Sequence, residues 1–211
     1  TMKWIKLITK QVTSCLEEIK RTQPAVADTI LENAQKRCRG AHVEDLCPIP
    51  LLIFASKYDS FRDEDGIKRK ALLSALRYVA HVHGASLFCV STAEKSLMNH
   101  FRNSLNHSVF LTDLKVKVST DVGGPLVIPA GLDNPESIGA PKTVRSQADF
   151  DSAPLGTRLR KWEDAVGEFF APQPDDTGSS GGGDGSNDGG GDENSNHREA
   201  NIFVEARVDT L

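Results

Sequence analysis

Two short polar stretches of this chain each follow an apolar run, and their residue types could bind a nucleotide base. The runs are residues 51–55 and 86–90. The six candidate residues are Ser56, Lys57, Asp59, Ser91, Thr92 and Ala93. A carboxylate can accept two hydrogen bonds, and an aliphatic lysine stem can lie over a flat ring. In open α/β sheets, ligands bind beyond the carboxyl ends of the strands. We therefore predict a base-binding site here, with no catalytic residue and no metal ligand.

The first stretch resembles the guanine-reading element of Ras-like GTPases, which is Asn-Lys-x-Asp at the end of a buried strand. In this chain Ser56 stands at the Asn position, and its hydroxyl lacks the reach of an amide. The change costs about 0.5–1.5 kcal/mol for each hydrogen bond lost. Ser91-Thr92-Ala93 occupies the place of the second base-contacting loop, which is commonly Ser-Ala-Lys. We expect a vestigial guanine-base site.

The phosphate-binding half of such a site is absent from this sequence. No G-x-x-x-x-G-K-[ST] motif occurs, and the glycines at 181–191 have neither a lysine nor a flanking strand. Without that loop there is no cradle for the phosphates and no hydroxyl for magnesium. We predict that the chain is not an enzyme, uses no cofactor and binds a base weakly at best.

Hydrophobic patterning predicts a series of strand, helix, strand and helix around these loops. Leu51 to Phe54 is a fully apolar run preceded by Pro48 and Pro50 and followed by the polar stop at Ser56, which favours a strand covered on both faces. A helix from 63 to 83 follows, with an inner stripe of Leu72, Leu76, Val79 and Ala80. The next strand, 86–90, should pair in parallel with the first. Residues 125–129 read as an edge strand, because prolines flank them.

Amphipathic helices are expected at both ends of this core. The apolar residues of the first are Trp4, Ile8, Val12, Cys15, Leu16 and Ile19. Those of the second are Val26, Ile30, Ala34 and Cys38, with an end near Gly40. A third helix carries Leu97, Phe101 and Leu105, and the last carries Leu159, Trp162, Val166, Phe169 and Phe170 before Pro172.

Other polar clusters are assigned structural roles. His81 and His83 are expected to be solvated histidines at a helix end, and the acids at 63–65 to complement a helix dipole. Arg158, Arg160 and Lys161 should form a solvated face. The cysteines, which lack a C-x-x-C pair, are interpreted as reduced, buried or half-buried small hydrophobes.

Composition bounds the remaining function classes. The chain has 25 basic and 29 acidic residues and a net charge of −4, so neither nucleic-acid nor membrane binding is indicated. It contains no run of about 18 apolar residues, and its first residues do not form a signal-peptide core. We expect a partial α/β domain at 1–172, a disordered low-complexity linker at 173–199 and a short apolar segment at 200–211. That segment could dock on a partner or back on its own domain.

Several blocks of the chain together resemble the dynein light intermediate chains, of the cytoplasmic dynein 2 type. The blocks are 48–59, which ends in Ser-Lys-Tyr-Asp, 68–70 with 76–87, 125–139, and the helix that ends at Phe169-Phe170-Ala171-Pro172. The resemblance covers Met2 to Pro172. The family's N-terminal half, with its P-loop-like strand, has no counterpart in this chain.

This resemblance implies the C-terminal part of a Ras-like, P-loop NTPase-like domain with a mainly parallel sheet. It implies a non-catalytic subunit that binds and stabilises the dynein heavy chain, with other dynein 2 subunits as partners and microtubules contacted only indirectly. The expected role is retrograde intraflagellar transport and cilium assembly. The expected location is the cytoplasm, cytoskeleton, cilium or flagellum, and basal body.

Two alternatives remain open from the sequence. One is a guanine-nucleotide-binding switch whose phosphate loop lies outside this chain. The other is a free-standing fragment that competes with the full subunit, for which the unpaired sheet edge predicts marginal stability.

Overall fold

The computed structural model describes residues 2–39 and 43–170 as a mixed α/β fold that is mostly helical. The helices are α1 (Met2–Thr22), α2 (Pro24–Arg37), α3 (Tyr58–Phe61), α4 (Gly66–Val82), α5 (Lys95–Phe110), α6 (Pro135–Ile138), α7 (Gln147–Ser152) and α8 (Leu155–Phe170). The strands are β1 (Leu52–Ala55), β2 (Ser86–Cys89) and β3 (Val127–Ile128). The predicted linker at 173–199, the segment at 200–211 and Gly40 lie outside the described residues.

The strands form one small mixed sheet with the order β1-β2-β3. β1 and β2 pair in parallel, as predicted, with Ile53 opposite Leu87. β3 is an end strand, but it runs antiparallel to β2, so the expectation of a mainly parallel sheet is wrong. The reason is the path of the chain before β3, since Ser119 forms a bridge to Val127 with N–O distances of 2.9 and 3.0 Å. That contact turns the chain back on itself and reverses the direction of β3.

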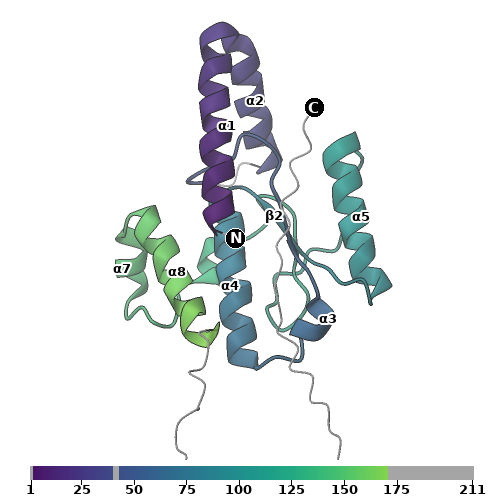
Figure 1. The fold of residues 1–211 in the computed structure, drawn as a ribbon, viewed down its shortest axis with the longest axis vertical. Helices are drawn as coiled ribbons and strands as arrows, with labels where there is room; N and C mark the ends of the chain where they lie inside the picture. The colour runs from purple at the N-terminus through teal and green to yellow at the C-terminus, as the bar shows by residue number, and fades with distance from the viewer. Residues whose placement is uncertain (1, 40–42, 171–211) are drawn as a thin grey trace, which may run out of the picture.

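Both faces of the sheet are covered, as expected for a run without a polar side. On one face Ile53 and Leu87 join the main core under α4. On the other face Phe54 and Phe88 pack against Phe101 of α5, and the ring centroids of Phe54 and Phe101 are 4.8 Å apart. Figure 1 shows α4 and α5 on opposite sides of β2. Alternation along two short strands thus divides the apolar residues between two cores.

The inner stripe of α4 differs from the predicted one. Val79 and Ala80 are buried as expected, whereas Leu72 and Leu76 are only half-buried and lie in a shallow groove facing Trp162. Tyr78 is buried between Phe150 and Trp162, with ring centroids 5.5 and 6.0 Å away. The sequence marks an apolar arc on this helix, but α4 contacts both the sheet and α8, so its buried arc is wider than one stripe.

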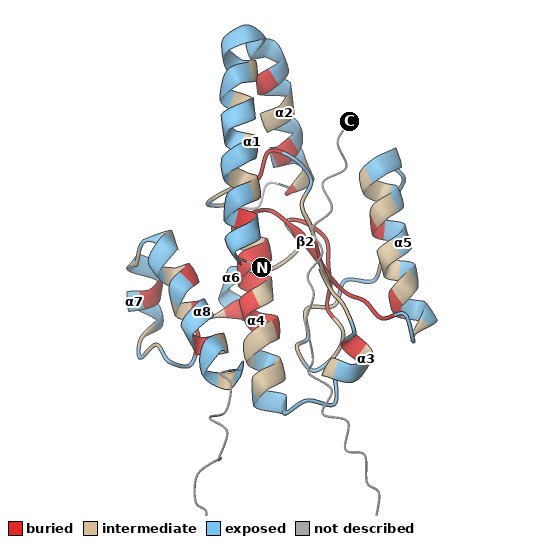
Figure 2. Ribbon diagram, viewed as in Figure 1, coloured by how far each residue is buried: buried red, intermediate tan, exposed pale blue. Residues whose placement is uncertain are grey.

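The α1–α2 hairpin projects from the rest of the fold (Figure 1) and is mostly exposed in Figure 2. Among the described side chains of α1, only Ile5 joins the main core, whereas Trp4 is 60% exposed. Cys15 is exposed as well, so its predicted burial is wrong, while Cys38 is buried as predicted. α1 is amphipathic as predicted, but α2 does not cover all of its apolar face.

Two buried polar contacts overturn predictions of solvated groups. His83 is 3% exposed, and its Nδ1 lies 3.2 Å from an Asp45 carboxylate oxygen. Arg158 is not part of a solvated face, because its guanidinium pairs with Glu44 and also donates to the Tyr78 hydroxyl at 2.9 Å. Neither partner could be inferred from sequence spacing.

The acids before α4 behave as predicted at one position. Asp65 is the N-cap of α4, and its carboxylate accepts hydrogen bonds from the amides of Ile67 and Lys68 at 2.9 and 3.1 Å. These bonds lower the pKa of Asp65.

Across the described ranges, every helix is too short or too polar to meet the requirements of a membrane span.

Candidate functional site

The two predicted loops meet at one edge of the sheet because their strands are parallel. The Val90 amide donates to the Ala55 carbonyl at 2.9 Å, and the Tyr58 amide donates to the Val90 carbonyl at 3.2 Å. The backbone of Lys57 is left-handed, with φ 57°, and from there the chain enters α3, a helical turn that the sequence did not predict. A left-handed conformation costs a non-glycine residue about 1–2 kcal/mol. The buried ring of Tyr58 anchors this turn.

A side-chain hydrogen bond joins the two loops directly. The Ser91 hydroxyl donates to an Asp59 carboxylate oxygen, and the same hydroxyl accepts from the Ala93 amide at 3.0 Å. Ser91 is 2% exposed, so its hydroxyl is held where it can reach Asp59. The hydrogen bond from Ser91 lowers the pKa of Asp59. One acceptor position of this carboxylate is therefore already used within the chain.

An ion pair lies beside this hydrogen bond. Arg62, just after α3, pairs with Glu94 at 2.7 Å, and both side chains are partly exposed. A pair in such a setting contributes about 0–1 kcal/mol. Sequence reasoning missed it, because the partners are 32 residues apart and no spacing rule connects them.

The six predicted residues do not all converge. Asp59 and Ser91 touch, Ser56 is half-buried with contacts of its own, and the side chains of Lys57, Thr92 and Ala93 are exposed. Binding of a guanine base at these residues stays a prediction.

The pKa shifts at this edge of the sheet disfavour proton transfer by Asp59 and nucleophilic attack by Cys89. A general base works best with a pKa near the operating pH, and the Ser91 hydrogen bond moves the pKa of Asp59 away from it. Burial raises the pKa of the Cys89 thiol to about 11, which makes it a poor nucleophile. Within residues 2–39 and 43–170, no three His, Cys, Asp or Glu side chains gather as metal ligands would.

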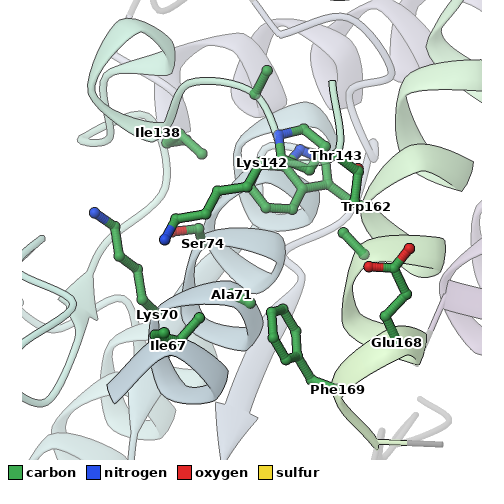
Figure 3. A pocket seen from close by; sticks show the side chains of 13 residues that line it. Ile67, Lys70, Ala71, Ser74, Ile138, Lys142, Thr143, Trp162, Glu168 and Phe169 are labelled. Atoms are coloured by element: carbon green, nitrogen blue, oxygen red, sulfur yellow. The ribbon is translucent and has the colours of Figure 1, made fainter. Parts of the chain in front are cut away.

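A hollow separate from these loops lies between α4 and α8, and we call it the α4–α8 groove. It is distinct from the shallow groove at Leu72 and Leu76. It has a volume of about 200 Å³ and is lined by α4, the 138–143 loop and α8. Figure 3 shows its lining, with Trp162 at the back, Phe169 at one end and Lys70 and Lys142 on one side. The sequence predicted the apolar residues of α8 but not the groove, which depends on how α4 and α8 cross.

Known proteins similar to this chain share one description. This chain is 37% identical over 123 residues to a cytoplasmic dynein 2 light intermediate chain 1 of Danio rerio, and the match covers 58% of this chain and 34% of the relative. The Mus musculus protein of that name is 37% identical over 129 residues, covering 61% and 36%. The Bos taurus protein is 36% identical over 143 residues, covering 67% and 39%. No family model matches the chain.

These relatives confirm the resemblance to dynein 2 light intermediate chains. The match spans little more than a third of each relative's own length.

Proposed function

We propose that this chain is a non-catalytic subunit of the cytoplasmic dynein 2 motor, which binds and stabilises the dynein heavy chain for retrograde intraflagellar transport and cilium assembly. The observation that carries the proposal is the similarity to dynein 2 light intermediate chains from three vertebrates. Other dynein 2 subunits are further partners, and contact with microtubules is indirect. The chain acts in the cytoplasm, at the cytoskeleton, and in the cilium and basal body.

The described residues support a scaffold derived from a Ras-like domain. β1 and β2 are parallel, are joined by α4 and end in the two loops that a guanine site would use. The structure leaves Asp59 bonded to Ser91, with a lowered pKa, and the sequence supplies no phosphate loop. Electrostatic stabilisation of a transferring phosphoryl group has no source among these residues. A binding role fits them better than hydrolysis.

Co-purification from ciliated cells tests the proposal. The tagged full chain should recover a dynein heavy chain, with the full-length Mus musculus relative as the positive control. Absence of the heavy chain from the sample, while the relative recovers it in parallel, would contradict the proposal. Far-ultraviolet circular dichroism of the purified chain checks that it is folded.

Asp59→Ala distinguishes this proposal from the guanine-nucleotide switch. A scaffold should recover the heavy chain equally well with or without this carboxylate, because Asp59 lies in the short helix α3 and belongs to neither apolar core. A switch should lose nucleotide binding and, with it, nucleotide-dependent recovery of the heavy chain. The matched control is Asp63→Ala, which removes an exposed acid just after α3. Direct titration with a fluorescent guanine nucleotide completes the comparison.

A further inference from the structure

The α4–α8 groove has a mainly apolar lining. Its walls include Ala71 of α4, Ile138 of α6, and Trp162, Ala165 and Phe169 of α8. The groove holds about 200 Å³, whereas small-molecule sites typically enclose about 300–1,000 Å³. A volume of this size suits one or two large side chains better than a cofactor. An apolar hollow that stays open to water is an unfavourable surface to leave uncovered.

The rim of the groove is mostly positive. Lys70 of α4 and Lys142 of the loop between α6 and α7 line one side of the groove, and both side chains are exposed. The acid among the lining residues is Glu168, across from them in Figure 3. An occupant that brings an apolar side chain together with neighbouring carboxylates would complement this surface.

The chain beyond α8 has that composition. From Gln173 to His197 it contains six acids and no Lys or Arg. The apolar residues Ile202, Phe203 and Val204 follow, with Glu199, Glu205 and Asp209 as the nearest acids and Arg198 and Arg207 as the nearest bases. Phe203 is the largest apolar side chain of this stretch. The distance is also suitable, because α8 ends at Phe170, next to the groove residue Phe169. A Gly- and Ser-rich spacer of about 30 residues has a root-mean-square span of roughly 30 Å.

We propose that the apolar segment 202–204 docks in the α4–α8 groove of its own chain, with Phe203 seated in the hollow and Glu205 near Lys70 and Lys142. Tethering favours this occupant over a second copy. Because residues 171–201 tether the segment to α8, its effective concentration at the groove does not depend on protein concentration, whereas a second copy meets the groove only at the bulk concentration. Any partner that uses this groove must displace the segment.

The test measures how accessible the groove is in the full chain. Cys15→Ser removes the exposed thiol, which leaves the buried Cys38, Cys47 and Cys89. Glu168→Cys then places a reporter thiol in the groove, and Asp164→Cys places one on the same helix outside it. Reaction with a bulky maleimide is followed by mass spectrometry. Phe203→Asp removes the docking side chain, and Thr210→Asp adds the same charge without doing so.

Docking predicts that Phe203→Asp speeds labelling of the Glu168→Cys thiol by at least about fivefold, because the thiol reacts only in the fraction of molecules whose segment is undocked. Thr210→Asp should leave that rate unchanged, and the Asp164→Cys thiol should respond to neither substitution. An unchanged rate in Phe203→Asp overturns the proposal. So does protection that increases with protein concentration, since it identifies the segment of a second copy.

Hydrogen exchange keeps the proposal testable if Glu168→Cys destabilises the fold. In the otherwise unmodified chain, amides of residues 202–206 should exchange more slowly than in Phe203→Asp, and those of α4 near Ala71 should follow the same trend. Equal exchange in both proteins overturns docking.

Discussion

Arg77 and Asp133, which are 56 residues apart in sequence, form a buried bidentate ion pair. The Nε–Oδ2 distance is 2.9 Å and the Nη2–Oδ1 distance is 2.6 Å, with each side chain 5% exposed. The same guanidinium donates to the Ser137 hydroxyl at 2.8 Å. These bonds fix the 130–139 turn against α4, and that turn leads into the wall of the α4–α8 groove.

Asp133→Ala should destabilise the fold by about 3–5 kcal/mol, because it leaves the Arg77 charge buried without its partner. Urea unfolding measures the change. Glu163→Ala is the matched control, since Glu163 is exposed and its removal should change stability by no more than about 0.5 kcal/mol. A similar midpoint for both variants would show that the ion pair does not hold the turn.

Gly131→Ala should be strongly destabilising. Gly131 has φ +72°, and a methyl group there would clash with the Cys38 carbonyl oxygen and lie 2.7 Å from the Cys38 Cα. The left-handed conformation alone costs alanine about 1–2 kcal/mol, and the backbone clash adds to it. Gly167→Ala in α8 meets nothing within 4 Å and should stabilise the helix by up to about 1 kcal/mol. Thermal unfolding of the two variants should therefore shift in opposite directions.

Ser91→Ala should raise the pKa of Asp59 towards its ordinary value of 3.8, because the hydroxyl donor is lost. The folded-state pKa of Asp59 lies below that of the unfolded chain, so its contribution to stability is present above pH 3.8. The contribution is lost as the pH falls through the folded-state value. Carbon-13 NMR titration reads the Asp59 carboxyl directly. Asp65 is the internal reference, since its pKa is lowered by α4 amides and should not move.

His83 should make stability pH-dependent on the acid side of neutrality. Burial lowers the pKa of His83 below its ordinary 6.5, against the opposing effect of Asp45, and the Lys6 charge lowers it further. The unfolded chain therefore takes up a proton first, so stability falls as the pH drops from about 6.5 to the folded-state pKa. His83→Gln should flatten this decline in urea unfolding at pH 7.5, 6.5 and 5.5. Asp45→Asn should steepen it, and an unchanged slope in both variants would contradict the assignment.

Local sequence patterns predicted the two strands whose ends carry the candidate site. The run from Leu51 to Phe54 predicted a strand covered on both faces, and the repeat of strand and helix predicted its parallel partner at 86–90. Polar residues at the ends of these runs predicted where the loops are, because a buried strand has to end where polar groups begin. The short turn α3 escaped prediction, since its left-handed start at Lys57 has no glycine to signal it.

Contacts between distant residues were not predictable in this way. His83 was expected in solvent, yet Asp45 covers it, and Arg158 was expected on an exposed face, yet Glu44 and Tyr78 bind it. Spacing rules describe neighbours on one helix or strand. They do not describe partners brought together by packing.

The sequence by itself determined the resemblance to dynein 2 light intermediate chains, the lack of a phosphate loop in this chain and the two strand-end loops. Only the tertiary structure decided that β3 runs antiparallel to β2, that the Ser91 hydroxyl donates a hydrogen bond to the Asp59 carboxylate, and that α4 and α8 enclose a groove. The division has a physical cause. Residue types and periods act through local backbone preferences, whereas pairing and burial depend on which surfaces meet once the chain has packed.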